Sequence, residues 1–270
     1  MINKKIGIIG CGNMGEALLG RLAKAVEKST MLIVTELDAG RRETIQDRYK
    51  ITVGIDNNYL VKHCDVIIIA VKPKDFDNLL SREICCGASD KKLVISLAAG
   101  VTTGHIESLI GRHVPVVRAM PNMAAVIGEA ITSISAGSAA KNAHMKLARE
   151  ILENIGEVVD VDEKLADAVT AVSGSGPAYF FHLMEAMMEA AEGLGIDKRS
   201  AERLIYKTAL GSAKLVHELK IHPAVLRRRV TSRGGTTEAA FKVFKAGKFK
   251  AIVKEAIECA CSHSKKIARR

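Results

Sequence analysis

The chain has 270 residues, of which 48% are hydrophobic, and a formal net charge of +10 at pH 7. This size and composition predict a globular protein with a sizeable core, organised as one large or two modest domains. No window reaches the roughly 18 consecutive apolar residues of a membrane span, and charged Lys4 and Lys5 stand where a secretion signal would have its apolar core. We therefore expect a cytoplasmic protein without membrane segments.

The charge distribution argues against a nucleic-acid partner, and the cysteine spacing argues against disulfides and a metal site. The basic residues are spread along the chain beside acidic ones, and only 4% of the residues are aromatic, so we expect no nucleic-acid partner. The six cysteines form two close sets, Cys85-Cys86 and Cys259-x-Cys261, but no paired C-x-x-C spacing. Free, buried thiols are predicted, with neither disulfides nor a metal site.

Near the N-terminus, an apolar strand expected over residues 5–9 leads into Gly10-Cys11-Gly12-Asn13-Met14-Gly15 and then an amphipathic helix. In this G-x-G-x-x-G pattern Gly10 makes the turn, Gly12 lets a pyrophosphate approach the backbone, and Gly15 allows close packing of helix on strand. Strand, tight turn and helix together predict a dinucleotide site, with phosphates facing the N–H groups at the helix start.

The second strand, expected over residues 31–35, is followed by Glu36, which lies 36 − 15 = 21 residues past the last glycine. A carboxylate at this distance accepts hydrogen bonds from the ribose 2′-hydroxyl of NAD and repels a 2′-phosphate. Arg41 and Arg42 would favour the phosphate if they turned inward. Either NADH or NADPH is compatible with the sequence, and Glu36 favours NADH.

The strand and helix rhythm continues to residue 162 and predicts a parallel sheet with crossover helices. Further strands are expected over residues 66–70, 93–96, 116–119 and 157–161, and helices over residues 41–49, 59–64 and 143–155. Three of these strands lead into turns at the carboxyl edge, where open α/β sheets bind ligands. The turns are Val71-Lys72-Pro73, Ala98-Ala99-Gly100 and Met120-Pro121-Asn122.

The strand pattern stops past residue 162, and residues 163–270 predict a second, all-α domain. Helices are expected over residues 179–194, 200–219, 224–230, 237–246 and 249–267. The first of them is apolar on more than one side, through Phe180, Leu183, Met184, Met187 and Met188. Because so few helices cannot cover it within one chain, we expect an obligate homodimer or higher homo-oligomer formed through this domain.

Two loops of the helical region are rich in glycine and hydroxyl groups. The first is Ser173-Gly174-Ser175-Gly176-Pro177, and the second is Thr231-Ser232-Arg233-Gly234-Gly235-Thr236-Thr237. Hydroxyls beside the free N–H groups of a helix start suit a small carboxylate. An ordinary N-cap with a glycine-assisted turn would produce the same pattern.

Taken in order, these motifs closely resemble pyrroline-5-carboxylate reductase over nearly the full length. They are the glycine turn at 10–15, Ala70-Val71-Lys72-Pro73, Met120-Pro121-Asn122, Ser173-Gly174-Ser175-Gly176-Pro177-Ala178-Tyr179 and the 231–237 loop. The resemblance implies a Rossmann domain, residues 1–162, followed by a helical substrate and dimerisation domain, residues 163–270. It also implies reduction of the cyclic imine 1-pyrroline-5-carboxylate to L-proline by hydride from NAD(P)H, the last step of proline biosynthesis.

The resemblance also implies roles for individual residues. Gly10, Gly12, Asn13, Met14 and Gly15 would hold the pyrophosphate, and Asn57 the adenine-side ribose. Val71, Lys72, Pro73, Ala98 and Ala99 would line the nicotinamide half, with Met120, Pro121 and Asn122 at the floor. Ser232, Gly234, Gly235, Thr236 and Thr237 would bind the substrate carboxylate, with Ser175 as a further substrate contact, and the Thr237 hydroxyl would approach the ring nitrogen.

The chain departs from the family pattern at two places. Arg233 stands where the family usually has proline, and Met123-Ala124 stands where it usually has Thr-Pro. These departures keep a non-catalytic relative among the alternatives. Another Rossmann-plus-helical enzyme, such as a hydroxyacid dehydrogenase, would act on an alcohol rather than an imine. For the reductase we expect catalysis mostly by positioning, with Thr237 orienting the ring nitrogen.

Overall fold

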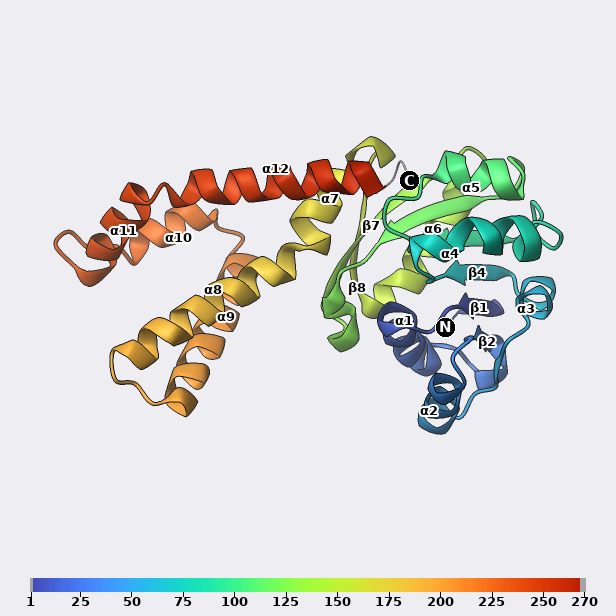
Figure 1. Ribbon diagram of the computed structural model, residues 1–270, viewed down its shortest axis with the longest axis horizontal. Helices are drawn as coiled ribbons and strands as arrows, with labels where there is room; N and C mark the ends of the chain where they lie inside the picture. The colour runs from blue at the N-terminus through green and yellow to red at the C-terminus, as the bar shows by residue number, and fades with distance from the viewer. Residues whose placement is uncertain (1, 268–270) are drawn as a thin grey trace. The chain divides into compact units, whose positions relative to one another are not determined.

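The computed structural model describes residues 2–267. The chain divides into two compact units, one made of residues 1–175 with 260–270 and the other of residues 176–259. Figure 1 traces the elements of both units along the chain.

The first unit is built on one eight-stranded sheet with the strand order β3-β2-β1-β4-β5-β6-β7-β8. Its strands are β1 Ile6–Ile9, β2 Leu32–Thr35, β3 Val53–Gly54, β4 Val66–Ile69, β5 Leu93–Ser96, β6 Val116–Met120, β7 Ala130–Ala136 and β8 Gly156–Asp160. Every neighbouring pair is parallel except β6 and β7. The strand order reverses between β1 and β4, which creates the crevice where open α/β sheets bind ligands.

Helices cover both faces of this sheet. Successive side chains of a strand point to opposite faces, so each strand contributes to a buried cluster on either side. In β1, Ile6 and Ile8 belong to one buried cluster and Ile9 belongs to the other. In β4, Ile68 belongs to the first cluster and Ile67 to the second. The helices and helical turns of this unit are α1 Asn13–Ala25, α2 Ala39–Tyr49, α3 Asn57–His63, α4 Pro73–Leu79, a π turn at Leu80–Ile84, α5 Thr103–Ile110, α6 Asn142–Leu152, α7 Ala166–Val169 and a second π turn at Thr170–Gly174.

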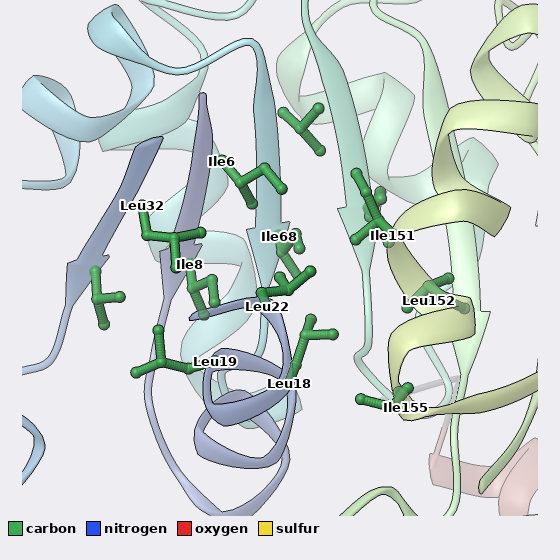
Figure 2. Close-up of a cluster of buried hydrophobic side chains, with 14 of the residues drawn as sticks. Ile6, Ile8, Leu18, Leu19, Leu22, Leu32, Ile68, Ile151, Leu152 and Ile155 are labelled. Carbon is green, nitrogen blue, oxygen red and sulfur yellow. The ribbon is translucent and has the colours of Figure 1, made fainter. Parts of the chain in front are cut away.

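The cluster under α1 and α6 fixes the glycine turn. Leu18, Leu19 and Leu22 of α1 pack against Ile6 and Ile8 of β1 (Figure 2), and all five side chains are fully buried. Burial of a single Leu or Ile side chain contributes about 1.5–3 kcal/mol. The start of α1 is therefore held firmly against the carboxyl end of β1.

The six predicted strands are all present, with ends that differ by no more than one residue. Two strands were not predicted. β3 has only two residues, and β7 carries Thr132, Ser133 and Ser135, polar side chains that are buried between β6 and β8. The predicted parallel sheet is confirmed except at one pair, because β7 runs antiparallel to β6.

The second unit is helical, as predicted. Its helices are α8 Gly176–Gly193, α9 Lys198–Leu219, α10 Pro223–Arg229, α11 Thr236–Ala246 and the first part of α12 Phe249–Ile267, whose last residues belong to the first unit. Pro177 lies near the start of α8 and Pro223 begins α10, where the missing N–H of proline removes no helical hydrogen bond. α8 packs along α9.

Candidate functional site

The turn between β1 and α1 has the backbone that the glycine pattern predicts. Gly10 has φ +83°, and its N–H donates to the Thr35 carbonyl oxygen at 2.9 Å, which ties the turn to the end of β2. A Cβ on Gly15 would clash with the Gly10 carbonyl oxygen. The fold itself therefore requires glycine at positions 10 and 15.

Gly12 is different, because the fold does not require glycine there. Its φ of −65° and ψ of −166° are open to any residue, and a Cβ would meet no atom within 4 Å. Gly12 is exposed at the N-cap of α1, where the first N–H groups of a helix have no partner within the helix. A ligand that approaches the backbone closely explains this glycine, and a pyrophosphate fits such a place.

A cleft of about 610 Å³ opens beside this turn, at the carboxyl ends of β1, β2 and β4. It brings together the predicted residues Gly10, Gly12, Glu36, Asn57, Val71 and Lys72. It also includes residues that the sequence analysis missed, namely Leu37, Ile55, Asp75, Asn78, Leu79 and Glu83. Asp75, Leu79 and Glu83 are spaced four residues apart along α4 and the Leu80–Ile84 π turn, a helical spacing that could have identified them.

Glu36 lies at the cleft and contacts the glycine turn directly. Its Oε2 accepts the Cys11 N–H at 2.8 Å, and its Oε1 accepts the Asp38 N–H at 3.1 Å. The carboxylate is therefore held at the end of β2 by two backbone donors. A carboxylate retains further lone pairs when it accepts two hydrogen bonds, so it can still accept a ribose hydroxyl.

Both nearby arginines already have partners. Arg41 also lines the cleft, but its guanidinium donates to the Cys11 carbonyl oxygen and to Glu16 Oε2, the latter at 2.7 Å. Arg42 Nη1 donates to the carbonyl oxygens of Glu36 at 3.0 Å and Leu37 at 2.7 Å. The Arg41 guanidinium is thus paired with a carboxylate, and the Arg42 guanidinium is held by two backbone carbonyl oxygens.

Asn57 is 7% exposed and joins the two sides of the cleft. Its Oδ1 accepts the Thr35 hydroxyl, and its Nδ2 donates to Glu83 Oε2 at 2.9 Å. Asn57 therefore fixes the first turn of α3 between the end of β2 and the Leu80–Ile84 π turn. Glu83 joins Glu36 as a second carboxylate of the cleft.

The remaining predicted cofactor residues lie on neighbouring elements. Asn13 and Met14 begin α1, and Pro73 begins α4, although the Pro73 side chain lies outside the described part of the structure. Ala98 and Ala99 follow β5, Met120 ends β6, and Pro121 and Asn122 follow it. The side-chain oxygen of Asn122 is buried without a hydrogen-bond partner among the described residues, as expected of an atom that a ligand would satisfy.

Arg118 of β6 is a functional candidate that the sequence analysis missed. Its side chain is 5% exposed, and Nη1 lies 3.4 Å from Glu163 Oε1. The Glu163 carboxylate also accepts the Thr103 N–H at 2.8 Å and the Thr103 hydroxyl at 2.6 Å. One carboxylate thus connects β6, just before Met120, with the start of α5.

The predicted substrate residues fall in both units. Ser175 follows the second π turn in the first unit, and its N–H donates to the Thr170 carbonyl oxygen at 2.9 Å. The 232–237 loop lies in the second unit and leads into α11.

Within the 232–237 loop, Gly234 has φ +77° and Gly235 is the N-cap of α11. The Gly235 N–H donates to the Ser232 carbonyl oxygen at 3.1 Å, and the Gly234 N–H donates to Glu238 Oε2 at 2.8 Å. Thr236 and Thr237 are the first two residues of the helix, and Gly235 has no side chain to cap their N–H groups. This helix start is open to an anion.

The cysteines correct one prediction. All six are free, but only Cys11 and Cys64 are buried, whereas Cys86 and Cys259 are exposed. Burial raises the pKa of Cys11 to about 12 and that of Cys64 to about 11. Cys86 is exposed because it lies in the turn that follows the Leu80–Ile84 π turn.

Two further findings concern ligands and membranes. Among residues 2–267, no three His, Cys, Asp or Glu side chains are grouped so that they could hold a metal ion. In the same range, no helix has both the length and the apolar character needed to cross a membrane.

Comparison with known proteins identifies the family. Residues 163–267 match the family model described as pyrroline-5-carboxylate reductase dimerisation, and residues 5–100 match the one described as NADP oxidoreductase, coenzyme F420-dependent. The pyrroline-5-carboxylate reductase of Pseudomonas aeruginosa is 37% identical over 269 residues, which cover 99% of this chain and 98% of the relative.

Two solved structures share the fold of nearly the whole chain. A pyrroline-5-carboxylate reductase from Coxiella burnetii is 33% identical with a TM-score of 0.87, covering 98% of this chain and 99% of that one. The Plasmodium falciparum pyrroline carboxylate reductase, crystallised with NADP bound, is 29% identical with a TM-score of 0.89, covering 99% of each chain. The chain belongs to the pyrroline-5-carboxylate reductase family.

Proposed function

We infer that this chain reduces the cyclic imine 1-pyrroline-5-carboxylate to L-proline with NAD(P)H, the last step of proline biosynthesis. The observation that carries the inference is the identity of 37% to a pyrroline-5-carboxylate reductase over 99% of the chain. The open backbone at Gly12, beside a cleft at the switch point of the sheet, supports the cofactor half of the reaction.

The cofactor would be held by the first unit. When bound, NAD(P)H supplies the hydride that reduces the imine carbon. Gly10, Gly12 and Gly15, with the N–H groups of Asn13 and Met14 at the start of α1, would receive the pyrophosphate. Further contacts are proposed for Asn57 on the ribose side and, around the nicotinamide, for Val71, Lys72, Pro73, Ala98, Ala99, Met120, Pro121 and Asn122.

We propose that NADH is preferred over NADPH. The Glu36 carboxylate lies at the cleft and would repel a 2′-phosphate while accepting a ribose hydroxyl. Arg41 and Arg42 support the same preference, because their guanidinium groups already have partners. A relative with NADP bound shows that the family also accepts the phosphorylated cofactor, so the preference depends on these residues of this chain.

The substrate carboxylate would be bound at the 232–237 loop. Ser232, Thr236 and Thr237 provide hydroxyls, and the start of α11 provides backbone N–H groups and the positive end of the helix dipole. A further substrate contact is proposed for Ser175. Thr237 would orient the ring nitrogen, and a protonated imine needs no strong protein acid because its positive charge already attracts the hydride.

We further propose that the functional boundary lies between residues 162 and 163 and that residues 163–270 form a homodimer or a higher homo-oligomer. The dimerisation family model begins at residue 163. Within α8 of a single chain, Phe180 and Phe181 are 66% and 54% exposed, which favours cover by a second copy. The cytoplasmic location predicted from the sequence belongs to the same proposal.

Incubation of the purified chain with NADH and 1-pyrroline-5-carboxylate tests the function. The expected result is loss of reduced cofactor that depends on the imine, together with formation of proline. Oxidation of a 2-hydroxy acid with NAD⁺, without any turnover of the imine, would contradict the proposal and favour a hydroxyacid dehydrogenase.

A further inference from the structure

Two adjacent thiols lie at the end of the Leu80–Ile84 π turn. The Sγ atoms of Cys85 and Cys86 are 3.6 Å apart, and the Cys85 thiol donates to the Ser81 carbonyl oxygen at 2.9 Å. Cys85 is partly exposed and Cys86 is exposed. Both sulfurs can therefore be reached from solvent as a pair.

The backbone beneath the pair is held in place. Leu80 and Ile84 of the π turn are fully buried, and the Cys85 N–H donates to the Leu80 carbonyl oxygen at 2.9 Å. On the other side of the pair, a Cβ on Gly87 would lie 2.7 Å from Val61 Cγ1, so this turn lies directly against α3. The fold thus brings the two sulfurs together, so a ligand that binds both pays little conformational entropy to order the site.

The distance between the sulfurs indicates what they can bind. A disulfide needs an S–S distance of about 2.05 Å, far shorter than the separation of these two sulfurs, and both thiols are free. Two sulfurs bonded to one soft atom at about 2.3 Å, with an angle between about 100° and 109°, lie about 3.5–3.8 Å apart. The observed 3.6 Å falls in that range.

The number of donors narrows the class of ligand. Structural zinc takes four protein ligands, whereas the described residues place no third His, Cys, Asp or Glu side chain with this pair. A trivalent arsenic atom that already carries one carbon substituent needs only two sulfurs. We propose that Cys85 and Cys86 form a dithiol binding site for a monosubstituted trivalent arsenic compound.

The binding reaction balances without an oxidant or a reductant. With an organic arsenic oxide, two S–H bonds break, two As–S bonds form, and the oxide oxygen leaves as water with the two thiol protons. The hydrogen bond with Cys86, followed by desolvation, raises the pKa of Cys85.

The site is separate from the cofactor cleft. Neither cysteine lines the cleft, although Glu83 of the same π turn does. The chain also supplies a matched control in Cys259 and Cys261 of α12. Two residues apart on a helix, their side chains point about 200° apart and cannot share one atom.

The test uses the reduced, full-length chain and phenylarsine oxide, with binding followed by intact-mass spectrometry. We expect one phenylarsenic group per chain, retained after washing with a monothiol and released by 2,3-dimercaptopropanol. Cys85→Ser and Cys86→Ser should each weaken binding at least tenfold, whereas the double variant Cys259→Ser/Cys261→Ser should bind as the unmodified chain does.

Far-UV circular dichroism confirms that the compared variants are folded. Absence of an adduct on the folded chain would overturn the proposal. So would an adduct that a monothiol removes, or one that persists when both Cys85 and Cys86 are serine.

Discussion

Replacing Gly12 by alanine should weaken cofactor binding without destabilising the chain. Alanine adopts the observed φ of −65° and ψ of −166° without strain, and its Cβ would meet no atom within 4 Å. The loss of a better N-cap residue and the smaller entropy of the unfolded chain oppose each other, and each amounts to about 1 kcal/mol or less. The free energy of unfolding should therefore change by less than about 1 kcal/mol.

The same methyl group takes the space through which a pyrophosphate approaches the backbone. We expect the Kd for NADH to rise at least tenfold, or about 1.4 kcal/mol, measured by calorimetric titration. Gly15→Ala is the matched control, because its Cβ clashes with the Gly10 carbonyl oxygen. That variant should lose about 1–3 kcal/mol of stability, and its Tm should fall by about 2–4 °C per kcal/mol.

Two results would refute this reasoning. One is a Gly12→Ala variant that binds NADH with the original Kd, since no phosphate would then approach residue 12. The other is a Gly12→Ala variant as unstable as Gly15→Ala, since the fold itself would then need the glycine.

Four further predictions concern specificity, catalysis, packing and pH. Glu36→Asn removes a carboxylate that repels a 2′-phosphate, so kcat/KM for NADPH should rise relative to NADH, and an unchanged ratio would contradict the proposed preference. Thr237→Ala should lower kcat by up to about 10²-fold, with activity restored in Thr237→Ser, and unchanged turnover in the alanine variant would exclude the threonine role. Glu163→Ala leaves the Arg118 guanidinium buried without its carboxylate and should cost about 2–3 kcal/mol in urea unfolding, whereas a change below about 0.5 kcal/mol would show that the pair is unimportant. The pKa of Cys11 is raised from 9.0 to about 12, so its stabilising contribution is complete below pH 9 and is lost as the pH rises toward 12; Cys11→Ala should show a smaller loss of Tm over that range, and an equal loss would argue against it.

The strands that could be predicted are those whose residues are apolar. β1 and β4 contain almost only isoleucine, valine and glycine, as strands covered on both faces do. β7 is also mostly buried, but its polar residues Thr132 and Ser133 do not fit a hydrophobic pattern. Its burial results from pairing with β6 and β8, which no local sequence signal reveals.

The same distinction applies to the site. The glycine turn could be predicted because Gly10 has a positive φ and Gly15 has no room for a Cβ, and both requirements are local to the turn. Arg118 could not be assigned from the sequence, because its significance lies in its contact with Glu163, 45 residues away along the chain. The helical spacing of Glu83 could place it on one face with Asp75 and Leu79, but not show its contact with Asn57, 26 residues away. The exposure of Cys86 likewise depends on how the turn after residue 84 lies against α3.

Isotope transfer tests the central claim most directly. The chain is incubated with 1-pyrroline-5-carboxylate and NADH that carries two deuterium atoms at C4 of the nicotinamide. The proposed function predicts L-proline with one deuterium at C5, the former imine carbon, and slower formation of this product by the Gly12→Ala variant at limiting NADH. Proline without deuterium, or no proline from a chain that binds NADH, would contradict hydride transfer to this imine.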